Sequence, residues 1–259
     1  MPSGFTVSNG QIIDPNGNVW HGDGIGVYDS QASSGGAATA NTILKEFPGI
    51  NLVRVANYSF GTPASYAAFT NTLTQAGVAV VFEDHNTDVT VLTGSALTAE
   101  SNWYASMASY YASNPYVMFQ TMNEPGAGDA DQMLATYNAI RGTGNNTIVF
   151  MEAGAGADGN TSSLGDTSVF ATMHNVAWDM HTYNWQSQYS TSVSSIQSDQ
   201  SNRLSVMHAL HSADGVMPVA TLEDGNSTNG INIDPGGSQE IQASFTKSWS
   251  CRCRSVDLG

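Results

Sequence analysis

Seven short runs rich in Val, Ile, Phe and other apolar residues recur along the chain, most of them separated by longer segments with helical spacing. The runs cover residues 24–28, 51–56, 78–83, 116–122, 147–152, 176–181 and 216–222, and the better helix candidates cover 38–47, 65–76, 99–112, 130–141 and 195–213. Runs that are apolar on both faces are typical of strands buried on both sides, and helical crossovers between them make the strands parallel. Periodicity leaves open whether the sheet closes into a barrel or stays open and doubly wound.

Residues 5–20 predict a different element, a β-hairpin. Two strand-like pieces surround the turn dipeptides Asn9-Gly10 and Asn16-Gly17. Neither GxGxxG after a strand nor GxxxxGK[ST] occurs, so the nucleotide-binding signatures of open sheets are missing. No linker, low-complexity tract or repeat of fixed period divides the chain, and we expect residues 1–259 to form one domain.

Charge narrows the classes of partner. The chain has 22 Asp and Glu against 7 Lys and Arg, a formal charge of −15 at pH 7, which repels nucleic acids and anionic membranes at long range. No apolar run approaches the roughly 20 residues that span a bilayer. We expect a monomer with neither nucleic acid nor membrane as a partner. Few lysines among many Ser, Thr, Asn and Gly suit secretion, and residues 1–4 contain no signal peptide, so we expect a secreted protein whose export signal is absent from this chain.

Polar residues close nearly every apolar run. In a parallel barrel the active site lies where the strands end, so these residues are the candidates for function. They are Arg54 in the second run, His85 after the third, Asn123 and Glu124 after the fourth, His181 after the sixth and Glu223 after the seventh.

Glu124 and Glu223 suit the cleavage of a glycosidic bond. That reaction needs one carboxyl group to give a proton to the leaving oxygen and another to attack the anomeric carbon or activate water. The ends of the fourth and seventh strands can face one another across a barrel mouth. Arg54 in a buried strand requires an anionic partner, and a catalytic carboxylate kept ionised by it would serve. The alternatives are that either glutamate is an exposed loop carboxylate and that Arg54 forms a structural ion pair with an Asp.

The histidines and tryptophans add candidates for sugar contacts. His85 and His181 suit hydrogen bonds to sugar hydroxyls, or are satisfied core histidines. Because HxH and HExxH are missing, we expect no metal site and no cofactor. Trp185, in the loop after the sixth run, is the tryptophan that we expect to stack on a sugar, whereas Trp103 lies in a predicted helix core.

The motif Asn123-Glu124-Pro125 after an apolar strand, together with the other strand-end residues, resembles glycoside hydrolase family 5 over residues 5–245. This resemblance implies a (β/α)8 TIM barrel with an N-terminal β-hairpin and a retaining mechanism. It makes Glu124 the acid/base, Glu223 the nucleophile and Asn123 the partner of the sugar 2-hydroxyl. In the same family pattern Arg54 holds Glu223, while His85, His181 and Tyr183 complete the subsite where the bond is cut, with Tyr183 hydrogen-bonding the nucleophile.

The end of the chain departs from the family pattern, which has an eighth strand bearing a tryptophan. Here Trp249, in Ser248-Trp249-Ser250, is the one tryptophan available for that subsite floor. The residues from Cys251 to Gly259 are basic where the rest of the chain is acidic. We therefore expect residues 250–259 to be a non-native tail and the eighth strand to be absent or improvised.

The sequence thus predicts a retaining endo-β-1,4-glucanase, a cellulase that hydrolyses a β-linked polysaccharide or oligosaccharide by double displacement without a cofactor. A second interpretation keeps this chemistry and changes the sugar, making the protein an endo-β-mannanase or another β-glycanase of the same family. A third interpretation, of another class, is an inactive carbohydrate-binding barrel.

Overall fold

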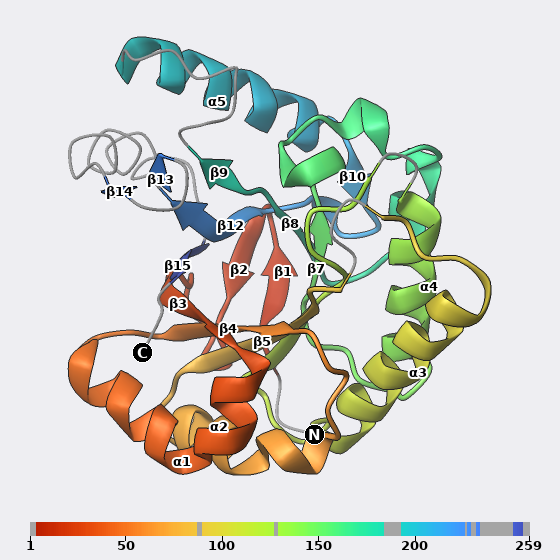
Figure 1. The fold of residues 1–259 in the computed structure, drawn as a ribbon. Helices are drawn as coiled ribbons and strands as arrows, with labels where there is room; N and C mark the ends of the chain where they lie inside the picture. Colours follow the sequence, from red (N-terminus) through yellow and green to blue (C-terminus); the bar gives the residue numbers. More distant parts are fainter. Residues whose placement is uncertain are drawn as a thin grey trace.

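The computed structural model describes residues 4–86, 90–126, 129–183, 193–225, 227–228, 232–233 and 251–255, and its centre is a closed parallel sheet (Figure 1). Around the ring the strands are β3 Gly22–Tyr28, β4 Leu52–Asn57, β5 Ala79–Asp84, β6 Val117–Gln120, β7 Val149–Glu152, β8 Val176–Asp179, β12 Val219–Gly225 and β15 Cys251–Ser255. All neighbouring pairs in the ring are parallel, and β15 pairs with both β12 and β3. The sheet therefore closes into a (β/α)8 TIM barrel and does not stay open and doubly wound. All seven predicted strands are confirmed.

Helices connect most of these strands and lie outside the ring. They are α1 Asp29–Glu46, α2 Ala67–Gln75, α3 Gly94–Tyr110, α4 Ala130–Arg141 and α5 Val193–His208. A short 3-10 helix, Pro63–Tyr66, leads into α2, and three others, Ala155–Ala157, Thr161–Ser163 and Thr167–Thr172, link β7 to β8. Shorter strands are β9 Thr182–Tyr183 beside β12, the pair β10 His211–Ser212 and β11 Gly215–Val216, and the pair β13 Ser227–Thr228 and β14 Asn232–Ile233. None of the helices in the described ranges is long and apolar enough to cross a membrane.

The eighth position of the barrel is occupied by β15. Its pairing with β3 runs from Cys251 opposite Gly22 to Ser255 opposite Gly26. Of the two expected outcomes, an absent or an improvised eighth strand, the structure has the second, because β15 is built from the segment expected to be a non-native tail. Trp249 lies outside the described residues, so its expected place in the subsite floor stays a prediction.

The predicted N-terminal hairpin is confirmed and covers the amino-terminal end of the barrel. Strands β1 Thr6–Ser8 and β2 Gln11–Ile13 pair across Asn9 and Gly10, whose φ angles of 52° and 71° are those of a two-residue hairpin turn. Apolar side chains of the hairpin region pack against the first inward-pointing residues of the barrel strands. This cluster contains Phe5, Val7, Ile12, Trp20, Leu52, Ala79, Val81, Met118, Ile148, Phe150, Ala177, Ala220 and Leu222.

Side chains on each barrel strand alternate between the interior and the helices. A second apolar cluster, on the helix side, includes Val53, Val80, Phe82, Phe119, Met151 and Trp178. The next inward positions toward the carboxyl ends of the strands hold polar side chains, all buried. They are Arg54, Glu83, Gln120, Glu152 and Asp179. We call these five residues the polar layer.

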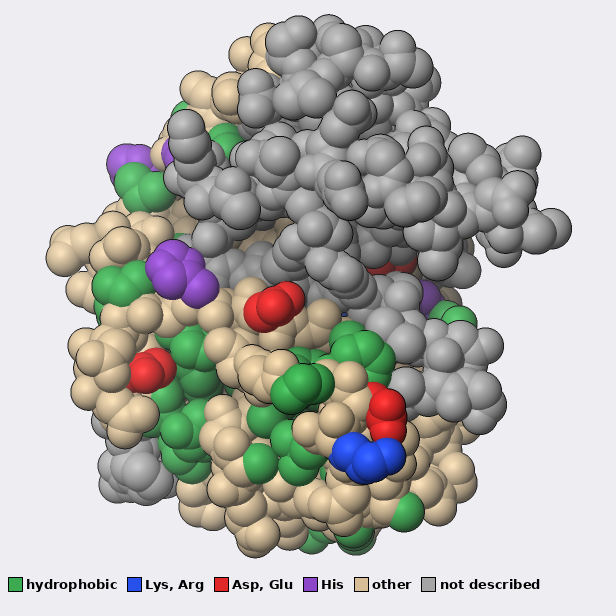
Figure 2. All heavy atoms as spheres, turned by 90° about the vertical axis from the view of Figure 1, so that its left-hand side faces the viewer, with side chains coloured by type: hydrophobic (Ala, Val, Ile, Leu, Met, Phe, Trp, Pro, Cys, Tyr) green, Lys and Arg blue, Asp and Glu red, His purple; other side chains and the backbone are tan. Residues whose placement is uncertain are grey.

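The described surface agrees with the acidic composition. Figure 2 shows a face with scattered acidic side chains and little basic surface, as expected for a chain with 22 acidic and 7 basic residues. An excess of acidic over basic side chains repels polyanions at long range.

Candidate active site

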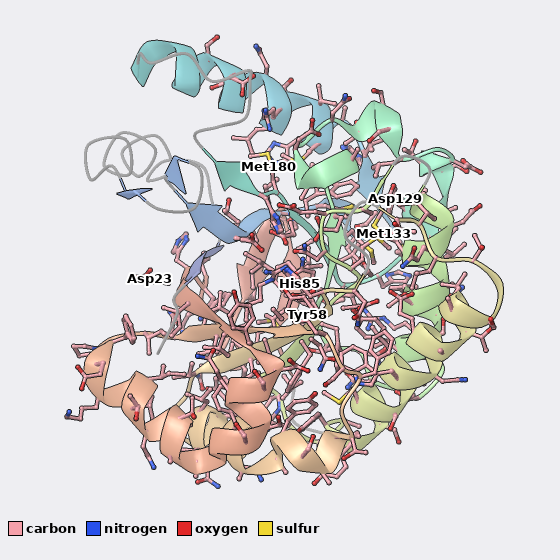
Figure 3. All side chains as sticks on the ribbon, in the orientation of Figure 1. Asp23, Tyr58, His85, Asp129, Met133 and Met180 are labelled. Carbon is pink, nitrogen blue, oxygen red and sulfur yellow. The ribbon has the colours of Figure 1, made fainter. Side chains whose placement is uncertain are left out.

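Aromatic side chains form one rim of the barrel mouth. Tyr28 ends β3, Tyr58 follows β4, and both are about half exposed. The ring of Tyr58 lies 4.6 Å from that of His85 and 5.9 Å from that of Tyr28, measured between centroids. Figure 3 shows Tyr58 and His85 side by side near the centre of the barrel view. Exposed rings in this position offer a surface on which a sugar can stack.

Below this rim, Glu83 orients His85. Oε1 of Glu83 is 2.7 Å from Nδ1 of His85 and 3.4 Å from Nη2 of Arg54, while Oε2 of Glu83 has no hydrogen-bond partner in the described part of the chain. A carboxylate on one ring nitrogen fixes the tautomer of a histidine. His85 therefore presents Nε2 as the atom for a further contact.

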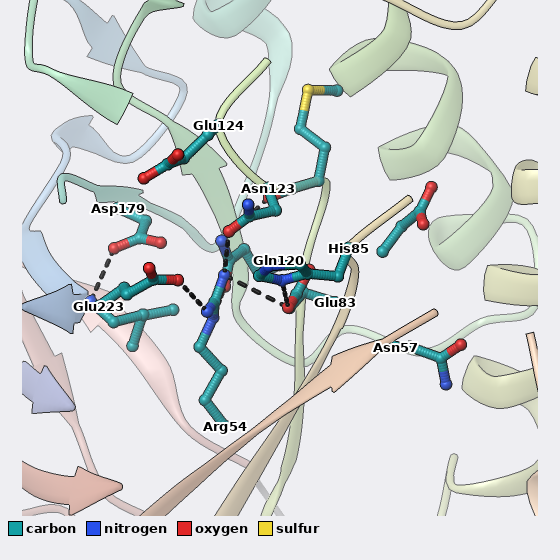
Figure 4. A network of polar contacts seen from close by, with 12 residues as sticks. Arg54, Asn57, Glu83, His85, Gln120, Asn123, Glu124, Asp179 and Glu223 are labelled. Carbon is teal, nitrogen blue, oxygen red and sulfur yellow. Dashed lines mark hydrogen bonds and ion pairs between the residues drawn. The ribbon is translucent and has the colours of Figure 1, made fainter. Parts of the chain in front are cut away.

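Arg54 is the hub of the polar network (Figure 4). It is 2% exposed, and its guanidinium donates from Nε to Oε1 of Gln120 at 2.8 Å, from Nη1 to Oε2 of Glu223 at 2.7 Å and from Nη2 to Oδ1 of Asn123 at 2.8 Å. Burial alone lowers the pKa of Arg54, but attraction by Glu83, Glu223 and the other carboxylates outweighs it, and the net shift is upward. The guanidinium is thus a fixed cation that ties three loops or strands to one point.

Glu124 follows β6 in a strained backbone conformation. Its φ is 40°, in the left-handed region that a residue other than glycine seldom adopts, and the following Pro125 normally favours an extended residue before it. Such strain is maintained only where the surroundings determine the conformation. The result is a carboxylate aimed into the mouth, with its side chain 30% exposed.

His181 joins the acidic side chains of the site. It is fully buried, its Nδ1 lies 2.9 Å from Oε1 of Glu124, and its Nε2 lies 3.2 Å from Oδ2 of Asp179. Oε2 of Glu223 is 4.0 Å from the same Nδ1. Burial lowers the pKa of His181, but the carboxylates of Asp179, Glu223 and Glu152 outweigh that effect and hold the pKa well above its ordinary value.

The two glutamates predicted to act together meet at this point. One ligand atom each of Glu124, His181 and Glu223 lie within 4.8 Å of one another, so an oxygen of Glu124 is within that distance of an oxygen of Glu223. Both side chains are partly exposed, Glu124 by 30% and Glu223 by 14%. The structure thus brings together two carboxylates that are distant in sequence.

Beneath them, Glu152 completes the polar layer. Nε2 of Gln120 donates to Oε1 of Glu152 and, at 2.9 Å, to the carbonyl of Met122. Oε2 of Glu152 has no hydrogen-bond partner among the described residues. Burial and the nearby charge of Asp179 raise the pKa of Glu152 well above its usual range, despite the opposing effects of His181, Arg54 and Gln120. Burial thus favours the protonated form of Glu152.

The structure brings six of the predicted residues into this network. They are Arg54, His85, Asn123, Glu124, His181 and Glu223. Tyr183 is described only as backbone in β9, whose pairing with β12 places residue 183 beside Gly225. Trp185, like Trp249, lies outside the described residues, so their predicted roles remain predictions.

Three residues of the network were not selected from the sequence. Gln120, Glu152 and Asp179 lie at or next to the ends of apolar strands, the same signal that singled out Arg54. Glu83 and Tyr58, which match no role in the family pattern, also contact predicted residues of the site. Side chains alternate along each strand, so a known barrel interior places Glu83, Gln120, Glu152 and Asp179 inward.

Within the described ranges, two groups of side chains approach the arrangement of a metal site. Glu124, His181 and Glu223 form one, and Glu152, Asp179 and His181 form the other. Both share His181, whose two ring nitrogens already face Glu124 and Asp179. A metal would have to displace these contacts, so the geometry favours a hydrogen-bonded network of acid and base groups.

A closed (β/α)8 barrel with two carboxylates facing one another at the carboxyl ends of its strands has the architecture of a glycoside hydrolase. The family model described as Cellulase (glycosyl hydrolase family 5) matches residues 21–239, and the chain belongs to this family. The resemblance seen in the sequence is confirmed, and the protein is a glycoside hydrolase. A comparison with curated proteins gave no match.

Solved structures share the fold at low sequence identity. The catalytic domain of the mannanase from Streptomyces sp. SirexAA-E has a TM-score of 0.75 and 17% identity, with 100% of this chain and 83% of that chain covered. The catalytic domain of endoglucanase Cel5A from Thermobifida fusca has a TM-score of 0.72 and 14% identity, with coverage of 100% and 86%. The mannohexaose complex of the Thermomonospora fusca β-mannanase has a TM-score of 0.73 and 19% identity, with coverage of 99% and 86%. At such identities these likenesses establish the fold alone.

Proposed function

We propose that the protein is a retaining endo-β-1,4-glucanase in which Glu124 is the general acid/base and Glu223 is the nucleophile. The observation that carries this proposal is the approach of the two carboxylates, with one oxygen of each within 4.8 Å of the other. Retaining glycosidases place their carboxyl groups about 5–5.5 Å apart, whereas inverting enzymes leave about 6.5–9.5 Å for a water molecule. The short separation supports double displacement.

In the first step an oxygen of Glu223 attacks the anomeric carbon while Glu124 gives its proton to the glycosidic oxygen. The carbon–oxygen bond to the leaving sugar breaks as the bond to Glu223 forms. In the second step Glu124 removes a proton from water, the water oxygen attacks the same carbon, and Glu223 leaves. Two inversions give net retention.

Arg54 supports the assignment of Glu223 as the nucleophile. Its Nη1 is 2.7 Å from Oε2 of Glu223, and a buried cation at that distance favours the ionised form that attack requires. Oδ1 of Asn123 accepts from Nη2 of the same guanidinium at 2.8 Å. This contact fixes the amide of Asn123 next to the nucleophile, where we assign it to the 2-hydroxyl of the sugar.

Replacing the two glutamates by alanine separates their roles. Glu223→Ala should abolish hydrolysis, and azide should restore turnover by forming a glycosyl azide of inverted configuration. Glu124→Ala should retain cleavage of aryl glycosides with a good leaving group, and azide should then give the product of retained configuration. Wild-type rates in Glu223→Ala would refute the nucleophile assignment.

The choice of a β-1,4-glucan rests on the family description, Cellulase. The competing candidate is an endo-β-mannanase, which is favoured by the mannanase among the similar structures at a TM-score of 0.75, against 0.72 for the endoglucanase. Parallel assays of carboxymethylcellulose, galactomannan and xylan decide between them. Faster release of reducing ends from galactomannan than from carboxymethylcellulose would replace the glucanase proposal by the mannanase one.

An inactive carbohydrate-binding barrel is the third candidate. The contacts among Glu124, His181, Arg54 and Glu223 argue against it, because binding alone does not require an ionised carboxylate beside a second one. Binding of oligosaccharides without hydrolysis of any β-glycan would establish it.

We also propose that the enzyme acts as a monomer outside the cell. The acidic, lysine-poor composition supports this, as does a polymeric substrate that is found outside cells. Light scattering of the purified protein and fractionation of a producing culture test the two statements separately.

A further inference from the structure

His181 lies between two carboxyl groups and can donate a hydrogen bond to each. Its Nδ1 is 2.9 Å from Oε1 of Glu124 and its Nε2 is 3.2 Å from Oδ2 of Asp179. A neutral imidazole has a single N–H, whereas an imidazolium has two. With both nitrogens facing carboxylate oxygens inside the protein, the imidazolium is the form that satisfies both contacts when Glu124 is ionised.

Asp179 is held as the anion that this imidazolium needs. Its Oδ1 accepts the backbone N–H of Leu222 at 2.7 Å, which ties the end of β8 to β12, and its Oδ2 faces His181. Asp179 is fully buried and has no exposure to water that would screen its charge. A carboxylate that accepts a backbone N–H and contacts a cation is stabilised in its ionised form.

The remaining charged groups around His181 do not replace Asp179. Glu223, on β12, is 4.0 Å from Nδ1 but forms its close ion pair with Arg54, on β4, at 2.7 Å. Glu152, on β7, lies within the same 4.8 Å group as Asp179 and His181. Its Oε2 has no partner among the described residues, and an ionised oxygen buried in that state is costly. Asp179 is therefore the carboxylate that acts as the counter-ion of His181.

We propose that Asp179 is a positioning residue that keeps His181 charged and oriented, so that His181 stabilises the carboxylate left on Glu124 when Glu124 gives its proton to the leaving sugar. This inference rests on the proposed function, because it concerns the acid/base role of Glu124. Asp179 touches neither the sugar nor the reacting atoms and acts through His181.

If Asp179 acts in this way, its removal should affect substrates differently, according to how much their leaving group needs a proton. Cleavage of a sugar leaving group needs the proton of Glu124, whereas a dinitrophenolate leaving group needs almost none. Loss of the imidazolium makes the carboxylate left on Glu124 less stable, because an opposite charge within hydrogen-bonding distance favours the ionised form of a carboxyl group. The pH at which the enzyme loses activity on the alkaline side then moves upward, while its rate on cellulosic substrates falls.

Asp179→Asn tests this with little change in shape, since Asn can still accept the N–H of Leu222. We expect kcat/KM on cello-oligosaccharides to fall by roughly tenfold to a hundredfold and the alkaline limb of its pH profile to rise by about one pH unit. The attack step on dinitrophenyl β-cellobioside, measured as the burst of dinitrophenolate, should change less than about threefold. Ring ¹⁵N shifts of His181 should show two protonated nitrogens at pH 7 in the wild type and one in the variant.

Asp214→Asn is the matched control. Asp214 also holds a histidine and a backbone N–H, with Oδ1 2.8 Å from Nδ1 of His174 and Oδ2 2.6 Å from the N–H of Asn175, but it lies on the surface outside the site. The Asp214→Asn variant should leave kcat/KM on both substrates and the pH profile unchanged. Equal losses on both substrates in Asp179→Asn, an unmoved alkaline limb, or a neutral His181 in the wild type would each overturn the inference. Failure of the proposed function would appear instead as hydrolysis that survives in Glu223→Ala.

Discussion

Nη1 of Arg54 lies 2.7 Å from Oε2 of Glu223, although the two residues belong to β4 and β12, which are not neighbours in the barrel. The same guanidinium contacts Gln120 and Asn123, so one side chain connects three other parts of the barrel. Closure of the sheet is what makes this contact possible, because an open sheet would keep the ends of these strands apart. The chemistry assigned to Glu223 thus depends on the barrel being closed.

Arg54→Lys should retain the charge and lose the fork of hydrogen bonds. A lysine ammonium is a point charge that cannot match three acceptors in one plane, so we expect kcat to fall by at least about a hundredfold. Arg54→Ala should also unfold more readily, because removing one partner of a buried ion pair costs about 3–5 kcal/mol. Steady-state kinetics and thermal denaturation measure the two effects. Lys45→Ala, which removes an exposed ion pair with Glu46, is the control and should alter neither. Wild-type kcat in Arg54→Lys would contradict the role given to the fork.

The buried pair of Asp84 and Glu100 predicts a stability that falls as pH rises. Burial raises the pKa of Glu100 to about 9, and the nearby charge of Asp84 adds to this shift. Burial also raises the pKa of Asp84 to about 6, with the charge of Glu83 adding to the shift and the hydrogen bond to Glu100 opposing it. A carboxyl group with a raised folded-state pKa stabilises the fold fully below its unfolded value, and this stability is lost as pH rises through the folded value. For Glu100 the window extends from its ordinary value of 4.5 to about 9.

Glu100→Gln should therefore make the melting temperature less sensitive to pH. Gln keeps an oxygen for Nε2 of Gln132, which donates to Glu100 at 2.9 Å, and it cannot ionise. Between pH 5 and 9 the melting temperature of the variant should fall less than that of the wild type, and each kcal/mol corresponds to roughly 2–4 °C in a domain of this size. Glu46→Gln, at an exposed glutamate, serves as the control. Parallel curves for wild type and Glu100→Gln would contradict the prediction.

Tyr58→Ala should weaken substrate binding more than it slows chemistry. The ring is 46% exposed and packs 4.6 Å from His85, so its removal takes away both a stacking surface and a support for His85. An aromatic contact is worth about 0.5–1.5 kcal/mol, which corresponds to a rise in KM of about twofold to tenfold. Tyr58→Phe should preserve the stacking, and Tyr110→Ala, at a residue that ends α3 and is 52% exposed, should have no effect. A loss confined to kcat would point to a different role.

Removal of residues 251–259 should open the barrel. Strand β15 pairs with both β3 and β12, so its loss leaves two strands with unpaired backbone groups. Exposed edges favour association between chains. We expect a lower melting temperature and larger particles by light scattering, whereas Cys251→Ala with Cys253→Ala keeps the backbone and should remain close to the wild type. An unchanged melting temperature in the truncated protein would show that β15 does not support the barrel.

The sequence was sufficient to predict the seven strands, the hairpin and the residues at the strand ends, because each depends on local pattern. Arg54 could be singled out since a charge inside an apolar run has few explanations. Asp179 and Glu152 carry a similar signal, but their partners could not be predicted, because a strand that is apolar on both faces does not indicate which face will become the barrel interior. Their contacts with His181 depend on closure and on how β8 and β12 are aligned.

The eighth strand shows a second limit of sequence patterns. Residues 251–255 alternate Cys and Arg and have none of the apolar character of the other barrel strands. Their place in the sheet comes from backbone pairing with β3 and β12, which any residue except proline can provide. A position between two existing strands can therefore be filled by a segment that no propensity would select.

The hairpin at the amino-terminal end of the barrel determines at which end substrate, water and product enter and leave the enzyme. Phe5 and Trp20 pack against the lowest interior side chains of the barrel, so that apolar side chains fill this end in the described part of the chain. The substrate, the attacking water and the product therefore all pass through the carboxyl-terminal mouth of the barrel. A polysaccharide longer than the site must lie across this mouth, with both of its ends outside the barrel.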